Sequence, residues 1–521
     1  MHAGGDGDGG SLWIDTTPAT NYPAVAGDAR YDVVVVGGGI TGLTTAYLLK
    51  QAGTKVAVIE RHRVATGTTG NTTAKVSSLH SLSYAQLVDK RGEEIARLYG
   101  EANQAAIDRI ASLVDQLGVD CQFERAAAYT YTESDEHVAK VEAEVEAAIR
   151  LGLPASYTDQ TDLPYPVRAA VRFENQAHFH PRRYCLALAA AIDGDGCAVF
   201  EQTDALAVDE QEDGVVVRTS SGALSAEQVV VATLLPFVDR GGFFAKAHPT
   251  RSYAMAVRVR GDVPQGMYIS VDSPTRTLRP VRYREALGLV LGGGGHHTGR
   301  EEHTSDQYKD VEDWARSTFD VEAVDYRWSA QDYTTLDSVP YVGRSPRSAR
   351  TFIATGFKKW GITNGTAAAM LLAETIGGRD NPWAEVFDAT RIGGAQSVAK
   401  AVKANLEVGK DFVKDHVGRR LQAASVDDLS TGQAGVVKVE GRSVGAYRDS
   451  SGILHAVSIT CTHMACTLRW NDAETTWDCP CHGSRFSTEG RVLEGPAVKD
   501  LERIDVAPGG GSAAPQPPPT V

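Results

Sequence analysis

Residues 31–60 read YDVVVVGGGITGLTTAYLLKQAGTKVAVIE and predict a strand, a glycine-rich turn, a helix and a second strand. Val33–Val36 form an uninterrupted apolar run, which is typical of a parallel strand that is covered on both faces. Apolar residues recur at helical spacing from Leu43 to Leu49, and Gly53 suits the end of that helix. The stretch therefore predicts an α/β domain built on a parallel sheet.

The turn carries the spacing G-x-G-x-x-G, with glycines at Gly37, Gly39 and Gly42. In dinucleotide-binding proteins the first glycine permits the tight turn, the second lets backbone approach the pyrophosphate, and the third lets the helix pack on the strand. The helix N-terminus then faces the phosphates with its partial positive charge. Glu60 ends the second strand, where an acidic residue binds a ribose hydroxyl. This context favours a dinucleotide site over a merely structural turn.

Further stretches indicate which dinucleotide is bound. GTTGNTTAKVSS (67–78) follows the second strand, FHPRRYCLALAAAI (179–192) contains a Pro-Arg pair, and VVVATLLP (229–236) ends a later strand. TFIATGFKKWGITNGTAAAMLLAETI (351–376) supplies a closing strand and helix. Together these stretches resemble the D-amino-acid oxidase/sarcosine oxidase superfamily of FAD-dependent oxidoreductases, from about residue 30 to residue 378.

The resemblance implies FAD as the cofactor and an α/β (α+β) fold, in which a Rossmann-like FAD-binding domain is interleaved with an antiparallel-sheet substrate domain. The closing helix is expected to open near Ile362–Thr363, beside the flavin pyrimidine, where its dipole stabilises negative charge on the reduced ring. The alternative for Trp360–Thr363 is a helix start that packs on the core. The cofactor-binding residues that the resemblance implies are Gly37, Gly39, Ile40, Thr41, Gly42, Glu60, Arg61, Thr68, Thr73, Ala74, Ala232, Thr233, Gly356, Trp360, Gly361, Ile362 and Thr363.

A second motif lies in residues 461–484, CTHMACTLRWNDAETTWDCPCHGS, which hold four of the seven cysteines. Each arm offers one thiol and one imidazole, as Cys461-x-His463 and Cys479-x-x-His482. A disulfide staple, a zinc site and an iron–sulfur centre are the alternatives. Tetrahedral zinc could use the same four groups, but zinc modules usually pair like ligands on one arm. Zinc also leaves two further cysteines without a role.

The full pattern resembles that of Rieske proteins, in which two Cys hold one iron of a [2Fe–2S] cluster and two His hold the other. The resemblance implies that Cys461 and Cys479 bind one iron and that His463 and His482 bind the second. It also implies a disulfide between Cys466 and Cys481 that links the two cluster loops.

Two neighbours of this motif bear on the cluster potential. Ser484 matches a family serine whose hydroxyl donates to a cluster sulfur, and Phe486 stands where high-potential members carry a tyrosine. Because hydrogen bonds to sulfur stabilise the reduced cluster, one donor fewer predicts a mid-range potential. For Trp470 and Trp477, core packing is the alternative to a role in shielding the cluster.

The length predicts several domains, since a chain of 521 residues is too long for one ordinary hydrophobic core. We expect an N-terminal extension (1–29) with a loose glycine-rich start, an oxidoreductase region (30–380), a helical linker (381–425), a Rieske domain (426–507) and a disordered tail (508–521). The FAD-binding parts of the oxidoreductase region are expected at about 30–85, 180–245 and 335–380. An amphipathic helix is expected within the linker, at 399–417.

The net charge of −14 argues against nucleic-acid or anionic-membrane partners, which favour basic patches. No apolar run is long enough for a membrane span, and the start of the sequence lacks a secretory or twin-arginine pattern, so a cytoplasmic location is expected. Cys121, Cys185 and Cys197 stand apart from the motif and are expected to be reduced and inert.

Combining a two-electron carrier with a one-electron carrier predicts a dehydrogenase. An amine, amino acid or related C–H substrate would give hydride to FAD, and the cluster would pass electrons singly to an external acceptor, which is a protein, a quinone or O₂. The alternatives are an electron relay without a small-molecule substrate and an O₂-using oxidase with a structural cluster. GGGGHHTG (292–299) lacks the third glycine of a second dinucleotide motif, which argues against NAD(P)H.

The catalytic residue is not determined by the sequence, and Lys75, His80 and Lys359 are the candidates. Sarcosine-oxidase-like proteins hold the substrate carboxylate with a basic residue at the place where Thr363 stands here. The arginine usual after the early glycine loop is also missing, and Lys75 is offset from it by one position. Both departures weigh against an amino-acid carboxylate as the bound group. Further pocket candidates are Tyr253, Arg279, His296 and Lys358.

Overall fold

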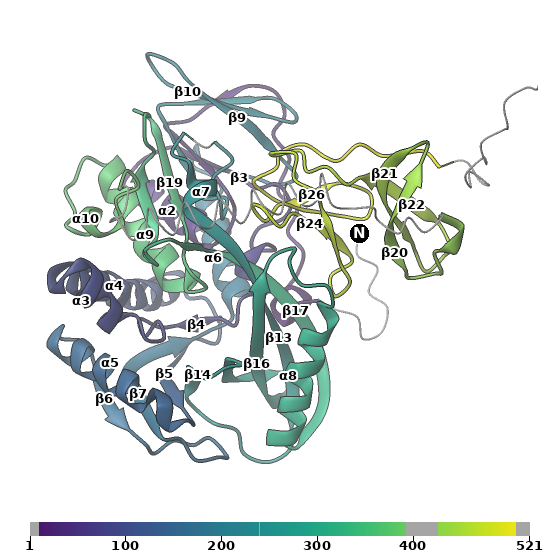
Figure 1. Cartoon of the computed structure of the whole chain (residues 1–521). Coiled ribbons are helices and arrows are strands. Elements are labelled where there is room, and N and C mark those ends of the chain that lie inside the picture. The colour runs from purple at the N-terminus through teal and green to yellow at the C-terminus, as the bar shows by residue number, and fades with distance from the viewer. Residues whose placement is uncertain (1–9, 239, 392–425, 507–521) are drawn as a thin grey trace, which may run out of the picture. The chain divides into compact units, whose positions relative to one another are not determined.

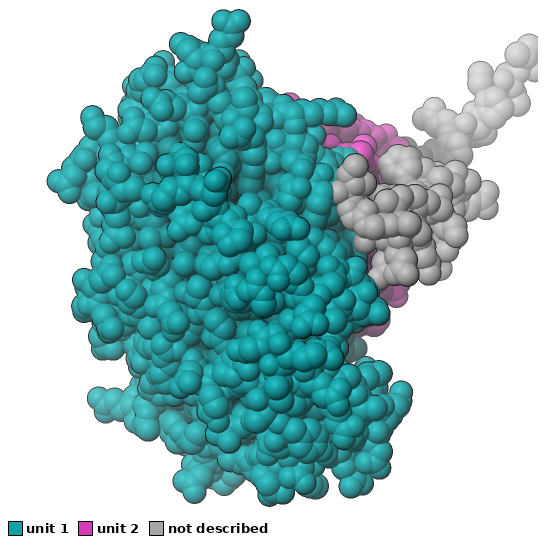
Figure 2. Space-filling model, turned by 90° about the vertical axis from the view of Figure 1, so that its left-hand side faces the viewer, with its two compact units in different colours: residues 1–296, 305–397 teal, residues 297–304, 398–521 magenta. Residues whose placement is uncertain are grey.

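The computed structural model describes residues 10–238, 240–391 and 426–506. The chain divides into two compact units (Figure 2). The first comprises residues 1–296 and 305–397, and the second comprises residues 297–304 and 398–521. The helix expected at 399–417 and the tail expected from 508 lie outside the described residues.

The first unit contains a six-stranded sheet with the order β18-β19-β12-β2-β3-β8 (Figure 1). The strands β19, β12, β2, β3 and β8 run parallel, while β18 is antiparallel to β19. Every residue of β2 and β3 is buried, which confirms the prediction of a strand covered on both faces. The bounds are β2 Val33–Val36, β3 Val56–Ile59, β8 Ala198–Phe200, β12 Gln228–Val231, β18 Tyr341–Arg344 and β19 Thr351–Thr355.

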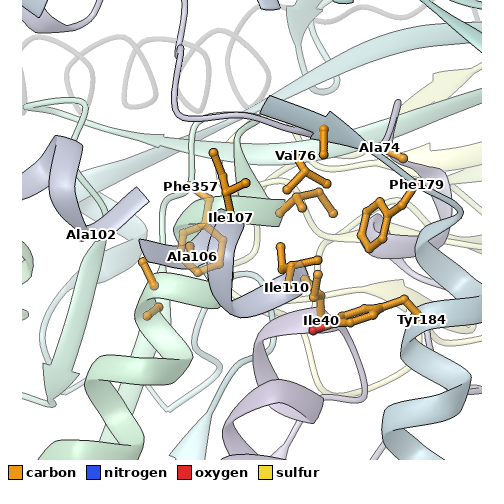
Figure 3. Packing of buried hydrophobic residues seen from close by; sticks show 14 of the residues in the cluster. Ile40, Ala74, Val76, Ala102, Ala106, Ile107, Ile110, Phe179, Tyr184 and Phe357 are labelled. Carbon is orange, nitrogen blue, oxygen red and sulfur yellow. The ribbon is translucent and has the colours of Figure 1, made fainter. Parts of the chain in front are cut away.

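Helices of this unit pack on one another and on the sheets, with α2 against β2 and β3 and α5 against β6 (Ala155–Thr158) and β7 (Ala169–His178). Their bounds are α2 Ile40–Gln51, α3 Tyr84–Arg91, α4 Glu93–Leu117, α5 Val138–Arg150, α6 Pro181–Ile192 and α9 Gly361–Ile376. The helical pattern from 84 to 117 is divided at Gly92, whose φ of 84° ends α3 and precedes α4. Ile40, Val76, Ile107, Ile110 and Phe357 meet in the core between them (Figure 3).

A nine-stranded, mostly antiparallel sheet forms the second layer of the same unit, in the order β17-β13-β16-β15-β14-β5-β7-β4, with β6 beside β7. It is the interleaved antiparallel sheet that the sequence predicted, and α8 (Ser305–Thr318) lies along β13 and β17 (Figure 1). The bounds are β4 Lys75–Val76, β5 Glu124–Thr132, β6 Ala155–Thr158, β7 Ala169–His178, β13 Ala247–Val259, β14 Met267–Ser270, β15 Arg276–Tyr283, β16 Ala286–His297 and β17 Val321–Thr335.

Smaller elements complete the first unit. A four-stranded sheet has the order β1-β11-β10-β9. Its strands are β9 Ala205–Glu210, β10 Val215–Thr219, β11 Ala223–Ala226 and β1 Ala29–Arg30. The short helices are α7 Phe243–Lys246, α10 Trp383–Phe387, and the 3₁₀ turns η1 Thr68–Asn71 and η2 Asp135–His137.

The described chain begins with a packed segment, while most of the glycine-rich start that was expected to be loose, residues 1–9, lies outside the described residues. Ser11 caps the short helix α1 (Leu12–Asp15), and Leu12 and Trp13 are both 1% exposed. The indole Nε1 of Trp13 donates to the carbonyl oxygen of Thr72 at 2.7 Å. A buried large aromatic side chain stabilises its segment by roughly 1.5–3 kcal/mol, which offsets the cost of ordering the backbone of about one or two residues.

The second unit is all-β in its described part, as predicted. A three-stranded antiparallel sheet has the order β20-β21-β22, and a four-stranded one has the order β23-β24-β25-β26. The bounds are β20 Ala434–Val439, β21 Arg442–Arg448, β22 Leu454–Ser458, β23 Arg469–Asn471, β24 Thr476–Asp478, β25 Arg485–Phe486 and β26 Val492–Glu494, after the 3₁₀ turn η3 Val426–Asp428. Across all the described ranges, no helix is both long and apolar enough to cross a bilayer.

Candidate functional site

The glycine turn after β2 has the geometry that the spacing predicted. Gly37 has φ 116°, and a Cβ there would lie 2.5 Å from the carbonyl oxygen of Ala232. A Cβ at Gly42 would lie 1.9 Å from the carbonyl oxygen of Gly37. Side chains are therefore excluded at both positions, since real Cβ atoms do not approach backbone so closely. The N–H of Gly37 donates to the carbonyl oxygen of Ile59 at 2.8 Å, which fixes the turn at the carboxyl ends of β2 and β3.

The carboxylate of Glu60 stands directly beside this turn. Its Oε2 accepts the N–H of Gly38 at 2.7 Å, and its Oε1 accepts the N–H of His62 at 2.9 Å. Both oxygens keep further lone pairs, so the group fits a ribose hydroxyl that approaches the turn. Arg61 lies close by and forms an ion pair with Asp204, with Nε and Oδ1 2.5 Å apart.

Loop 67–76 faces the N-terminus of α2. Gly39 is the N-cap of α2 and has no side chain to satisfy the first N–H groups, and the N–H of Ile40 donates to the hydroxyl of Thr69 at 3.1 Å. The neighbouring Thr68 hydroxyl donates to the carbonyl oxygen of Gln331 at 3.1 Å. A helix N-terminus with a glycine cap and a hydroxyl beside it fits a phosphate oxygen. Thr69 was missed by the sequence analysis, although it lies inside the glycine- and threonine-rich stretch that was singled out.

The N-terminus of α9 meets that of α2. A Cβ at Gly365 would lie 2.4 Å from the hydroxyl oxygen of Thr41, so the first turns of the two helices pack in direct contact. Trp360 is the N-cap of α9 and makes no side-chain cap bond. Gly356, just before it, has φ 81°. Two helix N-termini therefore point their partial positive charge into the same region, which fits a group that carries phosphates at one end and gains negative charge at the other.

Of the other predicted cofactor residues, Ala232 lies directly beside Gly37 of the glycine turn. Ala74 has φ 60° and is fully buried, and the N–H of Ala232 donates to the carbonyl oxygen of Val36 at 2.8 Å. Thr233 lies one residue further and donates to the carbonyl oxygen of Leu235 at 3.0 Å. The carbonyl oxygen of Thr73 accepts the Nε of a buried arginine at 2.6 Å. The fold thus brings together segments from four distant parts of the sequence.

His80 is the centre of a buried network under α9. Its Nδ1 lies 2.6 Å from the Tyr99 hydroxyl, and its Nε2 lies 2.8 Å from the carbonyl oxygen of Ser77 and 3.0 Å from the Thr363 hydroxyl. Its ring stacks on Trp360 with centroids 4.8 Å apart. Burial lowers the pKa of His80 to about 3, so the ring is neutral. Both ring nitrogens are engaged, and the Thr363 hydroxyl donates to Ser77, so this network holds the start of α9 in place.

Lys75 is half-buried at the start of β4. Its Nζ donates to the carbonyl oxygen of Tyr268 at 2.6 Å and contacts the hydroxyl of Thr277. Burial, and next the charge of Arg279, lower the pKa of Lys75 to about 7. Arg279 is itself bound by the carbonyl oxygens of Thr73, Phe179 and its own neighbour, and it lies over the Trp13 ring. These contacts assign Arg279 to structural support of loop 67–76.

A second group of polar side chains connects α9 with the antiparallel sheet. The Lys359 Nζ donates to the Ser252 hydroxyl at 2.6 Å, and its backbone N–H donates to Asp332 at 2.5 Å. Burial lowers the pKa of Lys359 and raises the pKa of Asp332 to about 6. On the same sheet the Tyr253 hydroxyl lies 2.8 Å from Nε2 of His296. The adjacent Lys358 is half-buried, and desolvation of its amine lowers its pKa.

The cysteine–histidine motif of the second unit comes together as predicted. Cys466 and Cys481 form a disulfide, which confirms that pairing. Cys461 and Cys479 are buried and outside the disulfide, and their thiols lie close enough to influence each other's titration. The neighbouring Cys479 thiol is the main cause of a Cys461 pKa lowered to about 7. The rings of His463 and His482 lie nearly perpendicular, with centroids 5.1 Å apart.

The cysteines and histidines of this motif bear on the choice between a zinc site and an iron–sulfur centre. The sulfurs of Cys466, Cys479 and Cys481 lie within 4.8 Å of one another, but two of them are bonded to each other and cannot ligate a metal. Two thiols and two imidazoles remain on the paired loops, and this set fits a [2Fe–2S] cluster with one iron held by sulfur and one by nitrogen. Ser484 is fully buried; its hydroxyl accepts the N–H of Ala497 at 3.0 Å and helps to lower the pKa of the Cys461 thiol.

Apolar side chains enclose this centre. Phe486 is fully buried in the same cluster as the four cysteines, opposite Trp477 on the neighbouring strand. Trp477 is 1% exposed and contacts Trp470, with ring centroids 5.0 Å apart. Low solvent access of this kind is one of the factors that set a cluster potential. Elsewhere, Cys121, Cys185 and Cys197 are buried thiols outside any disulfide, as expected.

Comparison with known families agrees with both sites. Residues 32–375 match the family of FAD dependent oxidoreductases, and residues 419–505 match the Rieske [2Fe-2S] domain. The chain belongs to the FAD-dependent oxidoreductase family and carries a Rieske domain after it. FAD and a [2Fe–2S] cluster are accordingly its cofactors.

Individual relatives resemble this chain over most of its length. The chain is 38% identical over 498 residues to the Bacillus subtilis protein YhfW, which bears the name of a Rieske 2Fe-2S iron-sulfur protein, with 95% of this chain and 97% of that protein covered. It is 27% identical to a glycine oxidase of Bacillus licheniformis, over 70% of this chain and 98% of that protein. The crystal structure of glycine oxidase from Geobacillus kaustophilus superposes with a TM-score of 0.59 at 19% identity, covering 70% of this chain and all of that one.

Proposed function

We propose that this oxidoreductase is a dehydrogenase that oxidises a small amine, amino acid or related C–H substrate and passes the electrons singly to an external acceptor. The observation that carries the proposal is the presence of both a dinucleotide cradle and a Cys₂His₂ donor set in one chain. FAD supplies a two-electron acceptor for hydride, and the [2Fe–2S] cluster supplies one-electron transfer. Covalent connection keeps the two carriers at high effective concentration.

In the first unit, the chain's own residues bind and orient the cofactor. The N-terminal N–H groups of α2 would hold the pyrophosphate, with Gly37, Gly39 and Gly42 giving room for its approach. Glu60 would accept the ribose hydroxyls. The N-terminus of α9 at Gly361–Thr363 would face the flavin pyrimidine, with the His80 network holding it in place.

Lys75 is the proposed proton-handling residue. Its pKa of about 7 leaves a large fraction of the amine neutral at physiological pH, as a general base requires. His80 is less suited, since both its ring nitrogens are engaged inside the core. Lys359 and the Tyr253–His296 pair are proposed to line the substrate side, because Lys359 connects the residues before α9 with Ser252 of β13 and the pair lies on β13 and β16 of the same sheet.

In the second unit, Cys461 and Cys479 are the proposed ligands of one iron, and His463 and His482 those of the other. Support comes from the thiol–thiol contact and the neighbouring imidazole rings.

The relative named glycine oxidase is consistent with a carbon–nitrogen substrate for this family. Thr363 lacks a positive charge and donates to the carbonyl oxygen of Ser77, so it is not suited to hold a substrate carboxylate as the basic residue of sarcosine-oxidase-like proteins does.

The test is anaerobic stopped-flow spectroscopy of the holoenzyme against a library of amines, amino acids and related metabolites. The expected result is bleaching of the flavin band followed by reduction of the cluster. A Cys461→Ser variant should retain the first phase and lose the second. If no metabolite bleaches the flavin, the protein is a relay. In a separate experiment, O₂ is added to the reduced wild-type protein and to the reduced Cys461→Ser variant. If O₂ reoxidises the flavin at the turnover rate in both, the protein is an oxidase with a structural cluster.

A further inference from the structure

The second unit includes a short segment from the middle of the sequence. Residues 297–304 belong to it by their contacts, although they are covalently continuous with β16 on one side and α8 on the other. The match to the Rieske family covers residues 419–505 and does not include this segment. The family match therefore does not explain why residues 297–304 pack within the second unit.

Thr304 anchors one end of the segment. Its backbone N–H donates to Oδ1 of Asp472 at 2.8 Å, and its hydroxyl lies 2.7 Å from Oδ1 of Asn471 and 2.5 Å from Oδ1 of Asp472. The hydroxyl oxygen also accepts the N–H of Ala473 at 3.0 Å. Thr304 is 3% exposed, so these bonds are shielded from competing water.

From Asn471 the contacts continue to the Cys479 loop. Asn471 Nδ2 donates to Oδ2 of Asp478 at 2.8 Å, and Asp478 directly precedes Cys479. The other carboxylate oxygen of Asp478 accepts the Thr476 hydroxyl at 2.8 Å and Nε of Arg485 at 3.1 Å. Thr304 is thus connected through one buried amide to the residue that precedes a proposed iron ligand.

Gly299 makes a second, independent contact with the same loop. Its φ is 69°, and a Cβ at this position would lie 2.8 Å from the nitrogen of Pro480 and 3.2 Å from the carbonyl oxygen of Asp478. The backbone of the segment therefore packs directly over the peptide units on both sides of Cys479. No side chain fits between them.

We propose that residues 297–304 are a clamp that positions the Cys479 arm of the cluster site, with Thr304 and Gly299 as its positioning residues. The Rieske centre of this chain is then completed by a segment that lies between β16 and α8 in sequence. Cluster ligands require support from surrounding residues to hold their geometry, and the hydrogen bonds around the ligand loops tune the potential. The inference does not depend on the substrate of the oxidoreductase.

The decisive experiment compares Gly299→Ala with Gly452→Ala in the full-length holoprotein. Gly452 also has positive φ, at 85°, and lies in the same unit, but a Cβ there would meet no atom within 4 Å. Backbone strain is therefore matched, and only the contact with Pro480 differs. Gly299→Ala is expected to change the g-values and midpoint potential of the cluster and to lose the cluster roughly tenfold faster on warming. Gly452→Ala should keep the wild-type g-values and potential.

Thr304→Val and Thr304→Ser give a second comparison that does not depend on the glycine. Valine removes the hydroxyl at nearly constant volume, whereas serine keeps it. Cluster loss should be several-fold faster in Thr304→Val, with a shifted potential, and near wild type in Thr304→Ser. Wild-type potential and g-values in both Gly299→Ala and Thr304→Val would overturn the proposal. If Gly299→Ala does not fold, equal potentials in the two Thr304 variants would overturn it.

Discussion

The two cofactor sites of this protein are built in opposite ways. The proposed FAD cradle consists largely of backbone: glycines without room for a Cβ and the N-termini of α2 and α9. The proposed cluster centre consists of side-chain donors on two short loops that a disulfide connects. A dinucleotide is recognised by shape and dipoles, whereas iron requires specific sulfur and nitrogen atoms. Substitutions should therefore act differently at the two sites and independently of each other.

The largest expected effect is the loss of one centre with retention of the other. Cys461→Ser removes a thiol that no other described residue can replace, so the cluster EPR signal and acid-labile sulfide should disappear completely. Flavin content should remain at wild-type level, because the cradle is made in the first unit. Cys121→Ser, at a buried cysteine outside the centre, is the control and should keep both. Loss of flavin from Cys461→Ser would contradict the independence of the sites.

Gly42→Ala tests whether the cluster site is retained when the FAD site is disrupted. Its methyl group would lie 1.9 Å from a carbonyl oxygen, and overpacking of this kind costs about 1–3 kcal/mol or more and displaces the turn. The purified variant should lack FAD absorbance while the cluster EPR signal persists. Gly67→Ala is the matched control in the neighbouring loop, since no atom lies within 4 Å of a Cβ there. Full FAD content in Gly42→Ala would refute the described turn.

Lys75 gives a pH test that is confined to the first unit. Its pKa is about 7 when folded against 10.5 for an ordinary lysine, so between these values the unfolded chain binds a proton that the folded one lacks. The free energy of unfolding should rise with pH in this window, by at most about 1.4 kcal/mol per pH unit. Lys75→Met should abolish this rise and raise stability at pH 7. Urea unfolding monitored at pH 7, 8 and 9 checks it, and an unchanged slope in Lys75→Met would exclude Lys75 as the cause.

The smallest expected effect concerns the cluster potential. Phe486 is fully buried beside the cysteines, so Phe486→Tyr places a hydroxyl within the enclosure of the cluster. One added hydrogen bond of about 1 kcal/mol would raise the midpoint by roughly 40 mV for a one-electron couple. Redox titration followed by EPR measures the shift. An unchanged or lowered midpoint would count against the role given to this position, and the flavin potential serves as the internal reference.

The fold was predictable where its physical cause is local. The run Val33–Val36, the glycine spacing and the alternation of short strands after residue 426 each depend on neighbouring residues, and the sheets confirm them. The disulfide was predictable because the whole Cys/His pattern resembles that of Rieske proteins, in which this pair is bonded. The packed start at Trp13 was not, since its indole bonds to Thr72, which is distant in sequence.

The sequence by itself determined both cofactor classes, because each depends on residue types at fixed spacing within a single turn or loop pair. The tertiary structure alone decided which groups surround them: Thr69 at the start of α2, Tyr99 beside His80, and Lys75 between Tyr268 and Thr277. It also decided that residues 297–304 belong with the Cys479 loop. Such contacts join segments far apart in the chain, and sequence spacing carries no information about which of these segments become neighbours when the sheets assemble.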